Sequence, residues 1–186
     1  KGKVKNIAKS KRLSSQEVLQ MFFFERFLER LSHSKYKFNF VIKGGFLISS
    51  LIGIEMRSTM DVDATLKGVM LNSSTIKDII ETISGIDMED HITWEIEKIS
   101  TIHEESEYED FRVTLIAHFF NMRVPVKLDI TTGDVIIPKE VDYGYFLLFG
   151  NEKIWIKAYP LLTILAEKIE SILARNVSNT RARDFY

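Results

Sequence analysis

The chain has 186 residues, of which 45% are hydrophobic and 27% are charged, and its formal net charge is -1. This length allows one sizeable core and one catalytic unit, and the composition excludes disorder of the whole chain. The absence of cysteine excludes disulfides, thiolate metal sites and cysteine nucleophiles, and the near-zero net charge means that any surface for nucleic acid or a membrane must be local.

Apolar runs in the sequence are short. The longest, residues 21–24 and 46–54, fall far below the roughly 20 residues that span a bilayer. No uninterrupted apolar segment follows the basic N-terminus, as a secretory signal would require. We therefore expect no membrane contact and a cytoplasmic protein. The sequence begins without Met and stops at an aromatic pair, which is compatible with a truncated chain.

The first elements in chain order are a basic arm and a helix, which we assign to a segment over residues 1–34 packed on the core. The arm either contacts phosphates or is a solvated, partly frayed terminus, and both interpretations remain open. Ser14 or Ser15 caps a helix whose apolar residues recur at helical spacing and are predicted to be core. These basic and apolar residues are Lys1, Lys3, Lys5, Lys9, Lys11 and Arg12, then Val18, Leu19, Phe22, Phe23, Phe27 and Leu31.

Residues 38–42 then predict a strand, Gly44-Gly45 a tight turn, and residues 46–54 a short apolar helix. In the next strand Met60, Val62 and Ala64 alternate with polar residues. Ser73 or Ser74 is expected to cap an amphipathic helix that ends near Gly85.

Further strands are predicted at residues 94–100, 111–119 and 124–131, with the acidic run 104–110 as a solvated loop. Pro160 suits the first turn of a last helix, whose apolar stripe is expected to be buried. The stripe comprises Leu161, Leu162, Leu165, Ile169, Ile172 and Leu173. This order of elements predicts an α+β domain over residues 35–186, with a mixed β-sheet and flanking helices.

The predicted chemistry rests on carboxylates at strand spacing. Asp61 and Asp63 project from the same face of a strand, so they can share a hard divalent cation such as Mg²⁺ or Mn²⁺. Asp129 lies on the polar face of another strand and is the natural third acid. Gly44 and Gly45, between a strand and a helix, allow backbone N–H groups to approach phosphate oxygens.

The order of these motifs resembles the nucleotidyltransferase superfamily, and specifically the AbiEii/AbiGii toxin family. The resemblance covers about residues 41–186. The motifs that carry it are KGGF at 43–46, RSTMDVD at 57–63, VKLDI at 126–130, LAEKI at 165–169 and TRARDFY at 180–186. Many superfamily members have Gly-Ser where this chain has Gly44-Gly45, and family members usually continue past the final motif.

The resemblance implies roles for particular residues. Asp61, Asp63 and Asp129 would hold the metal, Lys168 would contact nucleotide phosphate, and Asp184 would be a further active-site residue. Arg57, Thr59, Arg181 and Arg183 would join Gly44 and Gly45 in binding the nucleotide. From helix spacing alone, Lys168 is a lysine at the edge of an apolar stripe, and the two C-terminal arginines form a salt-bridge cluster.

The resulting hypothesis is a metal-dependent nucleotidyltransferase that transfers a nucleotide from an NTP to an acceptor, such as tRNA or another RNA, or protein. The resemblance implies the toxin of a toxin–antitoxin or phage abortive-infection pair, whose antitoxin acts without necessarily forming a stable complex. Two alternatives are a catalytically inactive nucleotide- or RNA-binding module and an antibiotic nucleotidyltransferase, whose acceptor pocket would be acidic.

Overall fold

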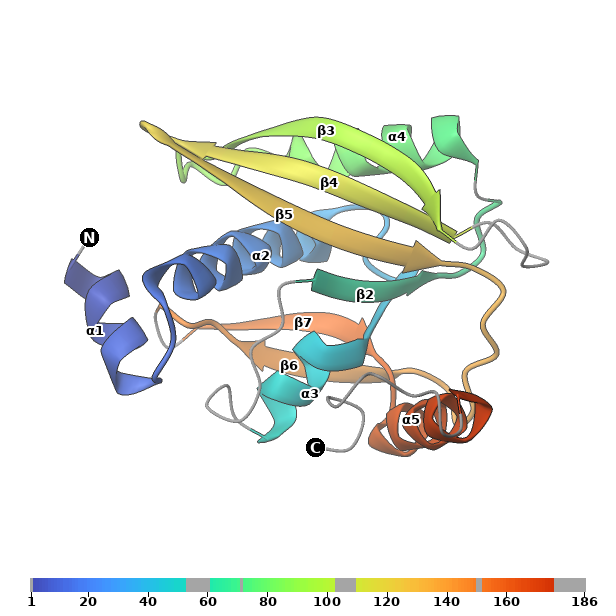
Figure 1. Ribbon diagram of the computed structural model, residues 1–186. Coiled ribbons are helices and arrows are strands. Elements are labelled where there is room, and N and C mark those ends of the chain that lie inside the picture. Colours follow the sequence, from blue (N-terminus) through green and yellow to red (C-terminus); the bar gives the residue numbers. More distant parts are fainter. Residues whose placement is uncertain (1, 53–60, 71, 103–109, 150–151, 176–186) are drawn as a thin grey trace.

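A computed structural model of the chain describes residues 2–52, 61–70, 72–102, 110–149 and 152–175. Within these ranges one mixed sheet with the strand order β3-β4-β5-β2-β1-β7-β6 is flanked by helices, so the predicted α+β class is confirmed (Figure 1). The strands are β1 (Phe40–Lys43), β2 (Asp61–Leu66), β3 (Thr93–Ile102), β4 (Asp110–Phe119), β5 (Met122–Thr131), β6 (Val141–Phe146) and β7 (Lys153–Ala158). The helices are α1 (Gly2–Ser10), α2 (Ser15–His33), α3 (Gly44–Ile52), α4 (Ser73–Ser84) and α5 (Leu161–Arg175).

The register of the sheet divides its side chains between two faces, because paired residues on neighbouring strands point to the same side. Asp63 pairs with Lys43 on β1 and with Asp129 on β5, and Lys157 on β7 pairs with Val41 two residues before Lys43. We call this side the site face. The alternate residues form the core face, where α2 packs against β5 and β7: Val62, Ala64, Val126, Leu128, Ile130, Ile154, Ile156 and Ala158, all buried.

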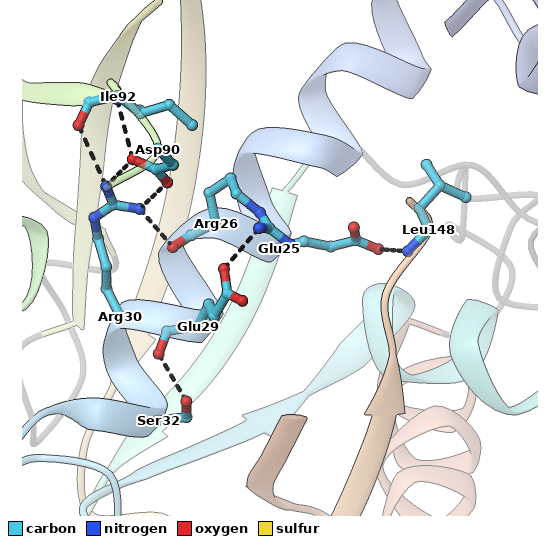
Figure 2. A network of polar contacts seen from close by, with 8 residues as sticks. All are labelled: Glu25, Arg26, Glu29, Arg30, Ser32, Asp90, Ile92 and Leu148. Carbon is cyan, nitrogen blue, oxygen red and sulfur yellow. Dashed lines mark hydrogen bonds and ion pairs between the residues drawn. The ribbon is translucent and has the colours of Figure 1, made fainter. Parts of the chain in front are cut away.

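Helix α2 is the central helix of the core and carries two buried charged groups. The Arg30 guanidinium makes two hydrogen bonds to Asp90, of 2.8 and 2.7 Å, and also donates to the Ile92 carbonyl. On the opposite side, the Glu25 carboxylate accepts hydrogen bonds from the Tyr145 hydroxyl and the Leu148 N–H (Figure 2 shows the latter). These contacts tie α2 to the start of β3 and to the end of β6.

Burial raises the pKa of Glu25 to about 7, although the hydrogen bonds from Tyr145 and Leu148 and the nearby Arg26 oppose this rise. Periodicity predicted the apolar face of α2 but neither buried charge, since a Glu or an Arg within an amphipathic helix ordinarily faces water.

Several local predictions are confirmed and others need correction. Ser14 caps α2 in a reciprocal capping box with Glu17. The α4 cap is Asn72 rather than Ser73 or Ser74, because the Asn72 side chain accepts from the Thr75 N–H. Helix α3 begins at Gly44 itself, so the glycine pair starts the helix rather than forming a separate turn.

The N-terminal arm folds as α1, which packs on α2, rather than as a frayed terminus. Phe38 precedes β1 instead of belonging to it and is 64% exposed. Strands β6 and β7 had no predicted counterpart. The acidic loop at 104–110 lies outside the described residues except for Asp110, which begins β4.

The expectation of a buried stripe on α5 is wrong. The helix packs inward through Thr163 and Ile164, which are buried, so the longer apolar stripe faces solvent. Helical spacing identifies an apolar face without showing what covers it. The exposed members are Leu161, Leu162, Leu165, Ile169 and Leu173, and Ile172 lies outside the described side chains. Over the part of the chain that the structure describes, none of the helices is long and apolar enough to cross a membrane.

Candidate active site

The three predicted carboxylates lie on the site face. Asp61 and Asp63 lie two residues apart on β2, and Asp129 pairs directly with Asp63 on the neighbouring parallel strand β5. Burial, reinforced by the negative charges of Asp129 and Asp61, raises the pKa of Asp63 to about 6, and the Lys43 charge opposes the rise. Three carboxylates that repel one another in a partly buried position are suited to binding a cation.

Gly44 allows β1 and α3 to approach Asp63 closely. Its φ of 70° is in the left-handed region that favours glycine, and a Cβ at this position would overlap the Asp63 Oδ2 atom. The next residue, Gly45, uses its backbone N–H to hydrogen-bond the Asp63 carboxylate. The positive end of the α3 dipole therefore faces Asp63, an arrangement that favours negative charge at this point.

Lys168 reaches the same place from α5. A cavity of about 170 Å³ is lined by Gly44, Asp63, Lys168, Lys43 and Glu167, together with Ile164. The structure thus joins the glycine motif, the Asp-x-Asp motif and the lysine of the last helix. A larger hollow, of about 860 Å³, lies between the end of α4 and the start of β3, away from these residues.

Arg112 is a site residue that the sequence analysis missed. Arg112 lies on β4, directly opposite Asp129 on β5. Its guanidinium donates two hydrogen bonds to the Asp129 carboxylate, of 2.7 and 2.6 Å. These bonds and the Asp129 charge raise the pKa of the Arg112 guanidinium. Polar and apolar residues alternate in 111–119, which suggests that Arg112 shares a face with Asp129. Only the register between β4 and β5 places the two residues side by side.

A second group that sequence reasoning missed lies beside Asp63, around Asp134. The Lys43 ammonium is 2.6 Å from Asp134 Oδ2 and 2.9 Å from Thr131 Oγ1. Burial would raise the pKa of Asp134, but hydrogen bonds from Lys43, Thr131 and Thr65 hold it below its ordinary value. Lys43 precedes the glycine pair directly, and this adjacency was the available signal for a role in the site.

Glu167 completes the cavity lining next to Lys168. Burial raises the pKa of its carboxyl, which also lies near Lys43, Asp134 and Asp63. The cavity therefore mixes two lysines with two acids, an arrangement suited to a polyanion held together with a cation.

The remaining predicted site residues cannot be placed. Arg57, Thr59, Arg181, Arg183 and Asp184 lie outside the described residues. Within the described ranges, no three His, Asp or Glu side chains converge closely enough to form a ready metal-binding cluster. Asp129 makes its paired contact with Arg112.

The fold and the positions of these side chains are those expected of the nucleotidyltransferase class. Two solved structures from Helicobacter pylori share the fold with a TM-score of 0.57 each: JHP933, at 17% identity, and a candidate nucleotidyltransferase, at 15% identity. Both similarities extend over 92% of this chain. The chain spans 64% of the length of the first protein and 66% of the second, just under two thirds. A search of curated proteins returns no match.

Residues 26–186 match the family described as "Nucleotidyl transferase AbiEii toxin, Type IV TA system". The chain belongs to this family, and the predicted resemblance is confirmed.

Proposed function

We propose that this chain transfers a nucleotide from an NTP to an RNA acceptor such as tRNA, using a divalent cation, and that this reaction makes it a toxin. One observation carries the proposal: Gly44, Asp63 and Lys168, from three separate elements, line one small cavity, with Asp129 in register beside Asp63.

The donor set is suited to Mg²⁺ or Mn²⁺. Asp61 and Asp63 would hold the ion, with Asp129 as a third carboxylate, since hard cations prefer oxygen ligands and typically combine one or two carboxylates with substrate phosphates. Burial and, after it, the charges of Asp129 and Asp61 raise the pKa of Asp63, and a bound cation would stabilise its charged form. When bound, the ion would neutralise charge on the NTP phosphates.

The protein groups then have separable tasks. The Lys168 ammonium pairs with the phosphates, and the N-terminus of α3 adds positive potential at Asp63. Asp129, held by Arg112, orients the acceptor hydroxyl. The oxygen of the acceptor hydroxyl forms a bond to the α-phosphorus of the NTP, and the bond from that phosphorus to the oxygen that bridges it to the β-phosphate breaks. Pyrophosphate leaves, and the proton of the hydroxyl passes to water.

Membership of a toxin–antitoxin family implies a cognate antitoxin. We propose that this antitoxin acts without a stable complex, that the toxin acts in the cytoplasm, and that the outcome is abortive infection. The basic helix α1, with Lys3, Lys5 and Lys9, offers positive charge to an RNA acceptor.

The test is transfer of label from each α-labelled NTP to total bacterial RNA in the presence of Mg²⁺. The wild-type chain is compared with Asp61→Ala, Lys168→Ala and a control, Lys98→Ala, which changes an exposed lysine on β3. We expect labelled RNA from the wild type and the control, and none from the two site variants or after addition of EDTA.

Equal labelling by Lys168→Ala and the control would refute the assigned role of this lysine. An absence of label in every sample, with NTP binding retained, would instead identify a binding module. Label on an aminoglycoside but not on RNA would identify a drug-modifying enzyme.

A further inference from the structure

The outer surface of β6 and β7 carries an unusual combination of exposed aromatic rings and lysines. Phe38, Phe146 and Trp155 are 64%, 67% and 61% exposed. Lys153 Nζ lies 4.9 Å from the centre of the Phe146 ring and 4.8 Å from that of the Trp155 ring. Large aromatic side chains gathered on one open surface, unlike a single exposed ring, mark an interaction site.

The architecture of the strands keeps this surface open. Trp155 pairs with Gly144 on β6, and a Cβ at Gly144 would overlap the Lys153 side chain, so the glycine lets Lys153 lie between the two rings. Beside them is a groove of about 310 Å³, whose lining includes Lys37, Phe38 and Lys157. We call Phe38, Phe146, Trp155, Lys37, Lys153 and Lys157 the aromatic–basic platform.

The strand residues of the platform, Phe146, Lys153, Trp155 and Lys157, lie on the site face, the same side of the sheet as the carboxylates. Trp155 and Lys157 are two residues apart on β7 and therefore share a face. Lys157 pairs with Val41, which shares a face with Lys43 on β1, and Lys43 pairs with Asp63. Four residue steps along β7 and two strand spacings separate Trp155 from Asp63, which corresponds to about 16 Å. Between them on this face, Val41, Thr65 and Tyr159 are buried, so the platform borders the active site and has no open path to it along the sheet surface.

The charges favour a nucleic acid as the occupant. The platform offers three lysines, and two acids lie near one of them, Lys157: Asp142, whose carboxylate is 2.8 Å from its ammonium, and Glu140. Stacked aromatic rings interleaved with lysines are the arrangement with which proteins bind single-stranded RNA or DNA, since every base has a flat face and every phosphate a negative charge.

We propose that the aromatic–basic platform binds the single-stranded part of the RNA acceptor at the border of the active site. This inference rests on the proposed function for the class of acceptor, and it adds the surface that would select an unpaired strand. The bases stack on Trp155 and Phe146, and the lysines move from the rings to the phosphates.

The experiment measures binding of a fluorescein-labelled oligouridylate, about 12 nucleotides long, by fluorescence anisotropy in the absence of NTP. We expect Trp155→Ala to weaken binding roughly 5- to 150-fold, the range for loss of one stacked base. Trp155→Phe should restore most of the affinity, because it keeps a ring. The matched control is Phe120→Ala, which removes a ring that is 82% exposed at the turn between β4 and β5.

Salt dependence provides a second measurement. Lys153→Ala should reduce the slope of log affinity against log salt by about 0.7, the value for one phosphate contact on a single strand. Lys98→Ala should leave the slope unchanged. Equal affinities of Trp155→Ala and Phe120→Ala, or equal slopes for the two lysine variants, would overturn the proposal.

The readouts separate this proposal from the proposed function. If the chain transfers no nucleotide, binding of the oligouridylate that depends on Trp155 would still support the platform. If Trp155→Ala labels RNA as well as the wild type does, the platform fails while the transferase stands. Binding of a labelled polyglutamate that depends on Trp155, with none of RNA, would overturn the proposal in favour of an acidic protein partner.

Discussion

Substitution of Gly44 by alanine tests the geometry of the site. The substitution has two physical effects. A left-handed residue other than glycine costs about 1–2 kcal/mol, and Gly44 has φ 70°. The added Cβ would also overlap Asp63 Oδ2, so the carboxylate must move. Displacement of a reacting group by about 1 Å costs roughly 100-fold in rate, or about 2.7 kcal/mol of transition-state stabilisation.

Gly68→Ala is the matched control for this prediction. Gly68 has a φ of 72°, and its added Cβ would meet only the Asn39 side chain, at 3.8 Å. Urea denaturation should show a loss of about 1–2 kcal/mol for Gly68→Ala, with label transfer unchanged. Gly44→Ala should lose at least as much stability and about 100-fold in transfer. Transfer by Gly44→Ala at the level of Gly68→Ala would refute the idea that close approach to Asp63 positions the carboxylate.

Three further predictions concern other residues. Glu25 has a folded-state pKa of about 7 against an ordinary value of 4.5, so the folded chain retains a proton that the unfolded chain releases. The free energy of unfolding should therefore fall by about 3 kcal/mol as the pH rises from about 4.5 to about 7, and Glu25→Gln should lack this slope in urea denaturation at successive pH values. Arg112→Ala should lower label transfer about 10- to 100-fold by freeing Asp129, with poor rescue by Arg112→Lys, since lysine cannot make the paired contact; wild-type rates would contradict the positioning role. Ser14→Ala should lower stability by about 1 kcal/mol through loss of the α2 cap and leave transfer unchanged, whereas an unchanged denaturation midpoint would contradict the assigned cap.

Local sequence patterns predicted the helices and strands that depend mainly on neighbouring residues. The alternation around Asp61 and Asp63 gave β2, and the capping serine with helical spacing gave α2. These predictions succeed because strand and helix periods depend on neighbouring residues. Asp129 was predicted as the partner of Asp63 from the polar faces of two strands and from the resemblance, and the register of β2 and β5 places the two residues side by side.

Other features depended on contacts between distant parts of the chain. Arg112 meets Asp129 only through the pairing of β4 with β5, and Lys43 meets Asp134 only through the loop after β5. The error on α5 has a similar origin, because an apolar stripe is the same whether a neighbour covers it or not. Strand β7 alternates plainly and could have been predicted from residues 153–158.

The order of the sheet also has a consequence during synthesis of the chain. Strand β2 lies between β1 and β5, and the cavity beside Asp63 is lined both by Gly44 and by Lys168 of α5, which are more than a hundred residues apart in the chain. Long-range pairing of this kind forms slowly and only when both segments are present. A nascent chain from which α5 has not yet emerged therefore lacks Lys168 in the cavity beside Asp63, and under the proposed function it would be inactive until α5 folds.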